Sequence, residues 1–149
     1  MANITVNGFD DVIKLLDKLS NKAKVDDIAK GAVDAAKDVL ASSMRSAIAG
    51  ADGHRGGNGK RHRENRSTNS VAGSVQPTAA KVNSYGVFSV SKPNGRDKEG
   101  TSNAKKAALL NYGTPQFSAR PWRDQAAKSA EGPCKKIIEE YVKSEMGAE

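Results

Sequence analysis

One stretch of the chain combines glycine and lysine in the way that phosphate-binding loops do. Residues 53–60 read Gly-His-Arg-Gly-Gly-Asn-Gly-Lys. A phosphate-binding loop requires a glycine five positions before the glycine of its Gly-Lys pair and a Ser or Thr after the lysine. His54 and Arg61 occupy those two positions, and a helix rather than a strand is predicted before the stretch. We therefore expect no nucleotide site here.

The histidines and the cysteine are the other residue types that could do chemistry. His54, His62 and the distant single cysteine, Cys134, lack the number and spacing of ligands that a zinc site needs. A histidine nuclease at residues 62–65 is the enzymatic alternative. It would need an orienting partner and usually a metal, which a glycine-rich loop does not preorganise. We expect no catalytic residue, no cofactor and no metal, and we expect Cys134 to serve only in packing.

The positive charge of the chain is concentrated in its middle. The formal net charge is +7, and residues 50–106 carry all of it, with eleven Lys and Arg against four Asp and Glu. This asymmetry indicates contact with nucleic acid or with an acidic protein surface, and a solvated basic loop is the alternative. Because residues 50–75 contain no aromatic residue, any contact with nucleic acid is expected to be to its phosphate backbone.

Two long basic loops, at about 50–69 and 91–106, are predicted to hold these cations. Both segments lack apolar periodicity and are rich in Gly, Asn and Ser, which is typical of connections that act in binding. The candidate contact residues in the loops are Arg55, Lys60, Arg61, Arg63, Arg66, Lys92, Arg96 and Lys98.

The elements that must position the loops follow from hydrophobic periodicity. The helices are predicted from about 10 to 20, from Asp26 to Gly50 with many alanines, and from Pro121 to Met146 with a break or kink at Gly132–Pro133. A short strand is predicted at 4–6, an antiparallel pair at 70–75 and 85–90, and a further strand, or alternatively a short helix, at 107–112. We therefore expect one α+β domain over residues 1–149, in which a small antiparallel sheet packs against the long alanine-rich helix and the C-terminal helix.

The composition also predicts how the protein associates. Hydrophobic residues make up 37% of the chain and aromatic residues only 5%, so the core is expected to be thin and contacts between copies to supply further burial. No segment has the ~18 apolar residues of a membrane span, and the N-terminus lacks the features of a signal peptide. We expect a protein that stays in the cytoplasm where it is made and does not contact a membrane.

The run at residues 112–122, which we call the corner, predicts a turn from a strand into the last helix. Gly113 permits the chain to turn without a Cβ clash, and the Thr114 hydroxyl is placed to bond a nearby backbone amide. Pro121 is suited to the first helical position, and Trp122 after it is expected to pack in the core. Because the cation of Arg120 is unfavourable at a helix N-terminus, we expect it to pair within the corner or across an interface.

The sequence at residues 110–122, Leu-Asn-Tyr-Gly-Thr-Pro-Gln-Phe-Ser-Ala-Arg-Pro-Trp, followed by a helix with Ala126, resembles the neck, or tail-completion, proteins of tailed bacteriophages. The pattern of that family is an aromatic-Gly-Thr step, a short variable loop, and Ala-Arg-Pro-aromatic before the last helix. The matching positions here are Tyr112, Gly113, Thr114, Ala119, Arg120, Pro121 and Trp122.

The resemblance implies a structural virion protein without catalytic activity. It implies a homo-oligomeric ring at the head–tail junction, assembled in the host cytoplasm around the DNA channel. The implied partners are other copies of the chain, the head connector, the tail terminator or tail tube, and the backbone of the DNA. A tail terminator ring that caps the tail tube and a free DNA-binding protein without sequence specificity are the alternatives.

Overall fold

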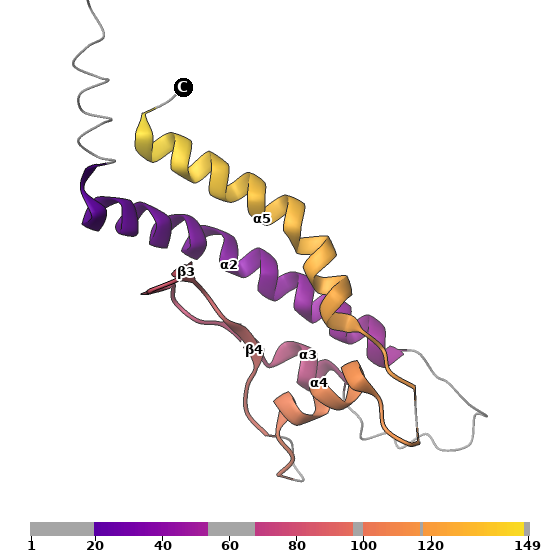
Figure 1. Ribbon diagram of the computed structural model, residues 1–149. Helices are drawn as coiled ribbons and strands as arrows, with labels where there is room; N and C mark the ends of the chain where they lie inside the picture. Colours follow the sequence, from indigo (N-terminus) through magenta and orange to yellow (C-terminus); the bar gives the residue numbers. More distant parts are fainter. Residues whose placement is uncertain (1–19, 54–67, 97–99, 117, 148–149) are drawn as a thin grey trace, which may run out of the picture.

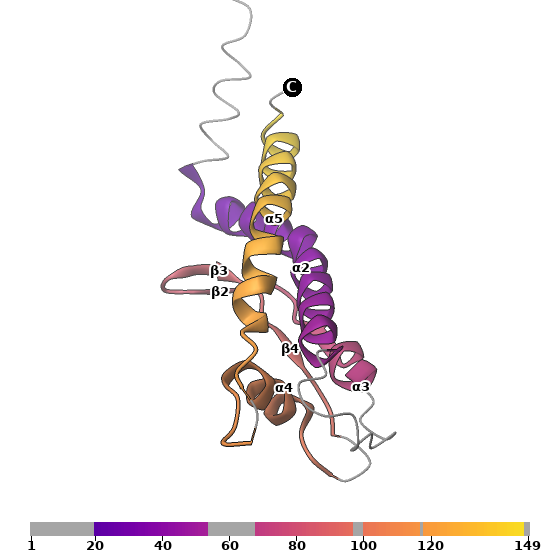
Figure 2. The ribbon, with the colours of Figure 1, turned by 90° about the vertical axis from the view of Figure 1, so that its right-hand side faces the viewer.

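The computed structural model describes residues 20–53, 68–96, 100–116 and 118–147. Two long helices, α2 and α5, lie side by side, and a β-hairpin with two short helices packs against α2 and its C-terminal end (Figures 1 and 2). The predicted strand at 4–6, nearly all of the predicted helix from 10 to 20 and most of the first basic loop lie outside the described residues. The architecture is α+β, as the sequence predicted.

Helix α2 spans Lys22–Gly53 and begins earlier than Asp26, the predicted start. The side-chain oxygen of Asn21 accepts hydrogen bonds from the backbone N–H groups of Ala23, at 3.1 Å, and Lys24, at 3.4 Å. These are free donors of the first turn, and an asparagine before a helix commonly satisfies them. The asparagine cap therefore sets the start of the helix, and the acidic pair at Asp26 lies inside it.

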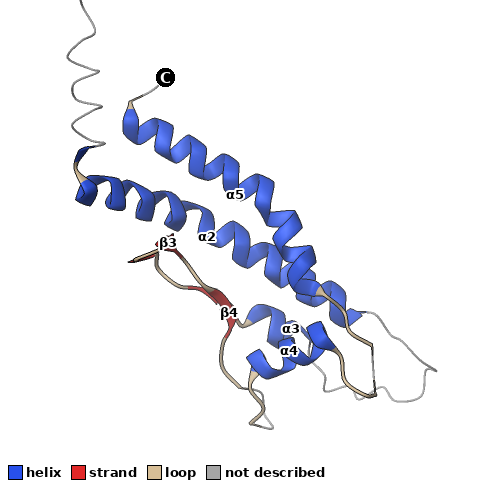
Figure 3. Cartoon of the chain, viewed as in Figure 1, coloured by secondary structure: helices blue, strands red, loops and turns tan. Residues whose placement is uncertain are grey.

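Helix α5 spans Trp122–Met146 and lies antiparallel along α2 (Figure 3). Small residues of α2 permit the close approach, since a Cβ at Gly31 would come within 2.5 Å of the Tyr141 ring. Nearer the middle, the Cys134 thiol donates to the Ala36 carbonyl at 3.7 Å, which agrees with its predicted packing role. Pro133 lies inside α5 without ending it, and the helix bends between its two halves (Figure 1).

Residues 75–93 form one long hairpin, which consists of two short antiparallel ladders. Strand β1 (Val75–Pro77) pairs with β4 (Ser91–Pro93), and β2 (Lys81–Asn83) pairs with β3 (Gly86–Phe88). Between the ladders the Thr78 N–H donates to the Val90 carbonyl at 2.8 Å, and the Val90 N–H donates to the Thr78 hydroxyl at 3.0 Å. The two ladders are therefore joined into one arm by side-chain and backbone bonds.

The predicted pairing of residues 70–75 with 85–90 is wrong. Most of the first segment belongs to helix α3 (Thr68–Gly73), in which Val71 and Ala72 are buried. The second segment contains β3, whose partner is β2. A short apolar run does not distinguish a helical turn from a strand, and here packing against the end of α2 selects the turn.

The predicted strand at 107–112 is also wrong, and its helical alternative is right. Helix α4 spans Asn103–Tyr112, so the second basic loop is shorter than predicted and β4 occupies its start. Its buried residues Asn103, Ala107 and Asn111 recur every four positions, which places them on one helical face. A spacing of four is typical of one helical face. Because two of the three residues are asparagines, a search for apolar periodicity does not detect it.

The core lies where the C-terminal part of α2 meets α3, β1, α4 and the start of α5. It is thin, as the composition predicted, because most of its buried members are alanines and valines around Ile48 and Trp122. The cluster comprises Ala41, Ile48, Ala51, Val71, Ala72, Val75, Ala107 and Trp122.

The arm is attached to α2 through Asp34. Its carboxylate accepts hydrogen bonds from the Ala80 N–H at 2.9 Å and from the Lys37 ammonium at 3.0 Å. The Ala80 bond, and after it the Lys37 bond, lower the pKa of Asp34 below its ordinary value of 3.8. A second attachment is made nearer the core, where the Arg45 guanidinium donates to the Val75 carbonyl at 2.8 Å.

We expect the Asp34 attachment to weaken in acid. Because the folded pKa lies below the unfolded one, the stabilisation is fully present above pH 3.8 and is lost as the pH falls through the folded pKa. In NMR titrations, the Ala80 amide shift should follow the Asp34 carboxyl with a midpoint below 3.8. Asp34→Asn keeps an acceptor but does not titrate, so it should abolish this transition. A transition that persists in the variant would refute the assignment.

Candidate functional site

The positive charge of the described chain is gathered in one lobe. We define the cationic lobe as residues 68–96 and 100–116, which comprise α3, the hairpin, α4 and the turn that follows. These described residues include five Lys and Arg and no Asp or Glu, and residues 97–99 between the two ranges, which the structure does not describe, are Asp, Lys and Glu. Helices α2 and α5 each carry five basic and five acidic residues and are neutral. The five cations are Lys81, Lys92, Arg96, Lys105 and Lys106.

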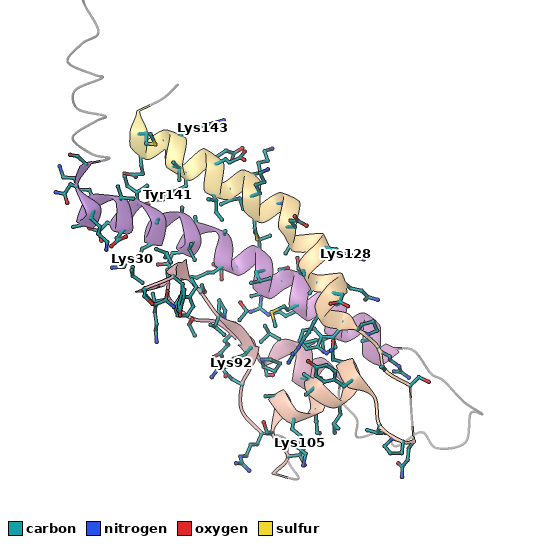
Figure 4. The ribbon with its side chains drawn as sticks, in the orientation of Figure 1. Lys30, Lys92, Lys105, Lys128, Tyr141 and Lys143 are labelled. Carbon is teal, nitrogen blue, oxygen red and sulfur yellow. The ribbon has the colours of Figure 1, made fainter. Side chains whose placement is uncertain are left out.

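The structure places only part of the predicted contact set. Lys92 on β4 and Arg96 after it belong to the lobe and are exposed, and the Arg96 guanidinium donates to the Gly100 carbonyl at 3.0 Å. Lys105 adds a further exposed cation from α4, as Figure 4 shows together with Lys92. Outside the described residues lie the other predicted contacts, Arg55, Lys60, Arg61, Arg63, Arg66 and Lys98.

Besides Lys81, two lobe cations were counted in the charge of residues 50–106 but were not selected as contacts, namely Lys105 and Lys106. The prediction of an irregular loop up to residue 106 gave no reason to distinguish them. Their position on α4 brings them to the lobe formed by the hairpin. Lysines and arginines neutralise phosphates without reading sequence, so a lobe with a net positive charge suits a polyanion backbone.

Other kinds of site find little support in the structure. Within the described ranges, no three His, Cys, Asp or Glu side chains come together as metal ligands would. None of the described helices is long and apolar enough to cross a membrane. Burial raises the pKa of the Cys134 thiol, so it is less ionised than a free thiol and less reactive. The two histidines lie outside the described residues.

The corner turns a helix, not a strand, into the last helix. Gly113 ends α4 with φ 77° and ψ −177°, and its N–H donates to the Leu109 carbonyl. The Thr114 hydroxyl accepts a hydrogen bond from the Gln116 N–H at 3.2 Å, which confirms its predicted role. Pro121 stands one position before the first residue of α5, and Ala119 is exposed. The predicted turn is therefore present, with a helical entry.

Trp122 packs in the core, as predicted. It is 2% exposed, and its indole N–H donates to the Ala107 carbonyl of α4 at 2.7 Å. Beside it, the Arg123 guanidinium lies 5.4 Å from the centre of the Tyr112 ring and 5.6 Å from that of Trp122. It also donates to the Tyr112 hydroxyl at 3.0 Å. Arg123 thus fixes the two aromatic residues of the corner to each other.

Asn111, which lies in α4 just before the corner, has a role that the sequence did not reveal. It is buried, and its side-chain oxygen accepts a hydrogen bond from the Arg123 N–H at 3.1 Å. That N–H belongs to the first turn of α5, where backbone donors lack helical partners. Asn111 therefore caps α5 from the end of α4. The only signal in the sequence was a polar residue, Asn111, between the apolar pair Leu109 and Leu110 and the aromatic Tyr112.

Arg120 bonds within the chain, although not within the corner itself. Its guanidinium donates to the Ala51 carbonyl at 2.7 Å, in the last turn of α2. Its backbone N–H donates to the Leu110 carbonyl at 2.9 Å. The cation thus lies at the negative end of the α2 dipole and satisfies one of its free carbonyls. Arg120 thus ties the corner to α2, and the predicted pairing within the corner is wrong.

Replacing Arg120 by Ala is expected to lower the free energy of unfolding by about 1.5 kcal/mol, the low end for a charged donor because the side chain is partly exposed. Urea denaturation measures this change. Lys128→Ala on the outer surface of α5 is the matched control and should change stability by less than about 0.5 kcal/mol. Equal losses in the two variants would show that the Ala51 bond contributes nothing.

Comparison with known protein-family models, characterised proteins and solved structures finds no significant match to this chain.

Proposed function

We propose that this protein is a structural subunit of a ring in the neck of a tailed bacteriophage, where it joins the head connector to the tail around the DNA channel. The proposal gives the protein no catalytic activity. Its partners are further copies of itself, the connector, and the tail terminator or tail tube. The resemblance of the corner motif to neck proteins supports this reading, and the physical roles of Gly113 and Thr114 agree with it.

The single observation that carries the proposal furthest is the separation of charge. Residues 68–116, which span the cationic lobe, carry six Lys and Arg against two Asp and Glu, whereas the α2 and α5 pair is neutral. A subunit of this kind suits a ring in which the lobe faces the DNA backbone and the helices support it from outside. Lys and Arg side chains neutralise phosphates without reading sequence, so the contact proposed for the lobe is with the DNA backbone.

The direct test is negative-stain imaging of purified protein incubated with connector-bearing heads or with tails. We expect a ring of this protein at the junction. A protein that stays monomeric and never enters particles would overturn the proposal. A ring found only on free tails would favour the tail terminator alternative, because that protein caps the tail tube.

A free DNA-binding protein is the second candidate, because the same lobe would give an isolated subunit affinity for duplex DNA. The neck subunit should bind DNA weakly until assembled, whereas the free binder should bind alone with affinity that falls steeply with salt. In the functional assembly, replacing Lys92 and Lys105 by Gln should reduce the slope of log K against log salt by about 2 for each subunit that contacts the DNA.

The neutral helix α5 provides the matched control for that measurement. Lys135→Gln with Lys136→Gln removes the same charge from outside the lobe, where both lysines lie beside glutamates. This pair should leave the salt slope unchanged. Equal effects of the two double variants would show that overall charge, and not the cationic lobe, governs binding.

A further inference from the structure

The arm presents two aromatic rings to solvent at its outer end. Tyr85 lies in the turn between β2 and β3 and is 96% exposed, and Phe88 on β3 is 40% exposed. The turn is ordered, because the Asn83 side-chain oxygen accepts hydrogen bonds from the N–H groups of Tyr85, at 2.9 Å, and Gly86, at 3.0 Å. Gly86 has φ +136°, a conformation that favours glycine. The backbone of Tyr85 is therefore held in place while its ring stays exposed.

A lysine lies directly beside one of these rings. The register of the β2 and β3 ladder places Lys81 opposite Phe88. Opposite residues of an antiparallel pair point to the same face, with Cβ atoms about 5 Å apart. Lys81 is exposed, and Lys92 adds a second exposed cation on β4. Cations and aromatic rings are thus interleaved on one hairpin.

No acidic side chain of the arm opposes these cations. Residues 75–93, all of them described, include the two lysines and no Asp or Glu. The carboxylate that attaches the arm to α2, that of Asp34, is already bonded to the Lys37 ammonium at 3.0 Å. Farther along the lobe, Figure 4 shows Lys92 and Lys105 following one another on β4 and α4. The surface that adjoins the two rings is therefore complementary to a chain of negative charges.

The combination of rings and cations favours one kind of polyanion over others. Proteins that bind single-stranded nucleic acid combine cations that follow the phosphates with aromatic rings on which the bases stack. A duplex hides the faces of its bases inside the helix, and a polyanion without bases has none. Tyr85 and Phe88 are three residues apart, about 10 Å along a strand, which is the length of about three nucleotides at roughly 3.4 Å each. A short single strand is therefore long enough to reach both rings.

We propose that the arm binds single-stranded nucleic acid, with bases stacked on Tyr85 and Phe88 and the phosphates along the lysines of the arm. Stacking accepts every base, so the contact has no sequence specificity. The sequence predicted contact with the phosphate backbone because residues 50–75 contain no aromatic residue. The hairpin brings rings and cations together outside that segment. The inference goes beyond the proposed ring, which needs only phosphate contacts, and it is tested apart from the ring.

Binding of the full chain to labelled oligonucleotides, followed by fluorescence anisotropy, tests the stacking. The probes are an oligothymidine of about 15 nucleotides, an abasic strand of the same length and charge, and a duplex of the same length. The protein should bind the oligothymidine about 10-fold more tightly than the abasic strand, because only the oligothymidine offers base faces. Since the neck subunit is expected to bind duplex weakly until assembled, the isolated chain should also prefer the oligothymidine to the duplex.

Replacing Tyr85 by Ala should weaken binding of the oligothymidine about 10-fold and leave binding of the abasic strand unchanged, because a stacked base is lost and no charge is. The melting curve should stay unchanged, because the side chain is 96% exposed. Tyr85→Trp should keep the stacking. Tyr112→Ala is the matched control, because that ring is 67% exposed but lies off the arm, against Arg123. It should leave binding of the oligothymidine unchanged.

The cations have a separate test. Lys81→Gln with Lys92→Gln should weaken binding of the oligothymidine and of the abasic strand alike. It should also reduce the slope of log K against log salt by about 1.4, at about 0.7 for each phosphate contact of a single strand. Lys135→Gln with Lys136→Gln, in the neutral helix α5, is the matched control and should leave the slope unchanged.

The outcomes separate this inference from the proposed function. Equal affinity for the oligothymidine and the abasic strand, or a preference for the duplex, would overturn the stacking whether or not rings form on particles. If Tyr85→Ala impairs joining without changing oligothymidine binding, the inference is also wrong and the end of the arm contacts a protein. If binding depends on the bases but the protein never enters particles, the inference stands and the neck function fails.

Discussion

Replacing Trp122 by Ala is expected to lower the free energy of unfolding by about 3–5 kcal/mol, as removal of a fully buried aromatic side chain does. Trp122 is 2% exposed and lies in the same cluster as Ile48 and Val75, the two largest fully buried side chains among the described residues. In a core made mainly of alanines, few neighbours are long enough to move into the space left behind. The substitution therefore leaves a cavity where α2, α4 and α5 meet.

Urea denaturation followed by circular dichroism measures this loss. Trp122→Phe keeps much of the ring but removes the 2.7 Å bond to the Ala107 carbonyl, so it should lie between wild type and Trp122→Ala. Tyr112→Ala is the matched control, because that ring is 67% exposed. It should cost about 1 kcal/mol, mostly from the contact with Arg123. A loss below that of the control would contradict a structural role for Trp122.

Replacing Gly113 by Val is expected to lower the free energy of unfolding by about 3 kcal/mol, the upper end for a strained backbone position because the new side chain is β-branched. The φ of 77° with ψ of −177° belongs to a region that residues other than glycine hardly populate. Relaxing this strain would move the N–H of residue 113 from the Leu109 carbonyl and misdirect the chain toward α5.

Gly132 is the matched control for Gly113. It lies inside α5 without positive φ, and a Cβ there meets no atom within 4 Å. Gly132→Ala should raise stability by about 1 kcal/mol, because alanine loses less conformational freedom in a helix. Gly113→Ala should lower it by about 1–3 kcal/mol. Thermal melting of the two variants should thus shift in opposite directions, and a shift in the same direction would show that Gly113 needs no special conformation.

The sequence alone determined the features that depend on local chemistry or on long periodic patterns. The alanine-rich period predicted α2, the apolar spacing after Pro121 predicted α5, and the count of charges located the cationic middle. Gly113 and Thr114 could be assigned to a turn because their roles depend on their own φ and hydroxyl. Each of these signals lies within a few residues or recurs over many turns.

Only the tertiary structure decided what depends on distant partners. The short runs at 70–75 and 107–112 fit either period, and packing on the end of α2 made both mainly helical. Arg120 had to find an acceptor, but only the fold brings the Ala51 carbonyl to it, 69 positions away along the chain. Asn111 likewise caps a helix that begins beyond the corner. Such bonds join segments that the sequence does not place together, so periodicity and spacing carry no signal for them.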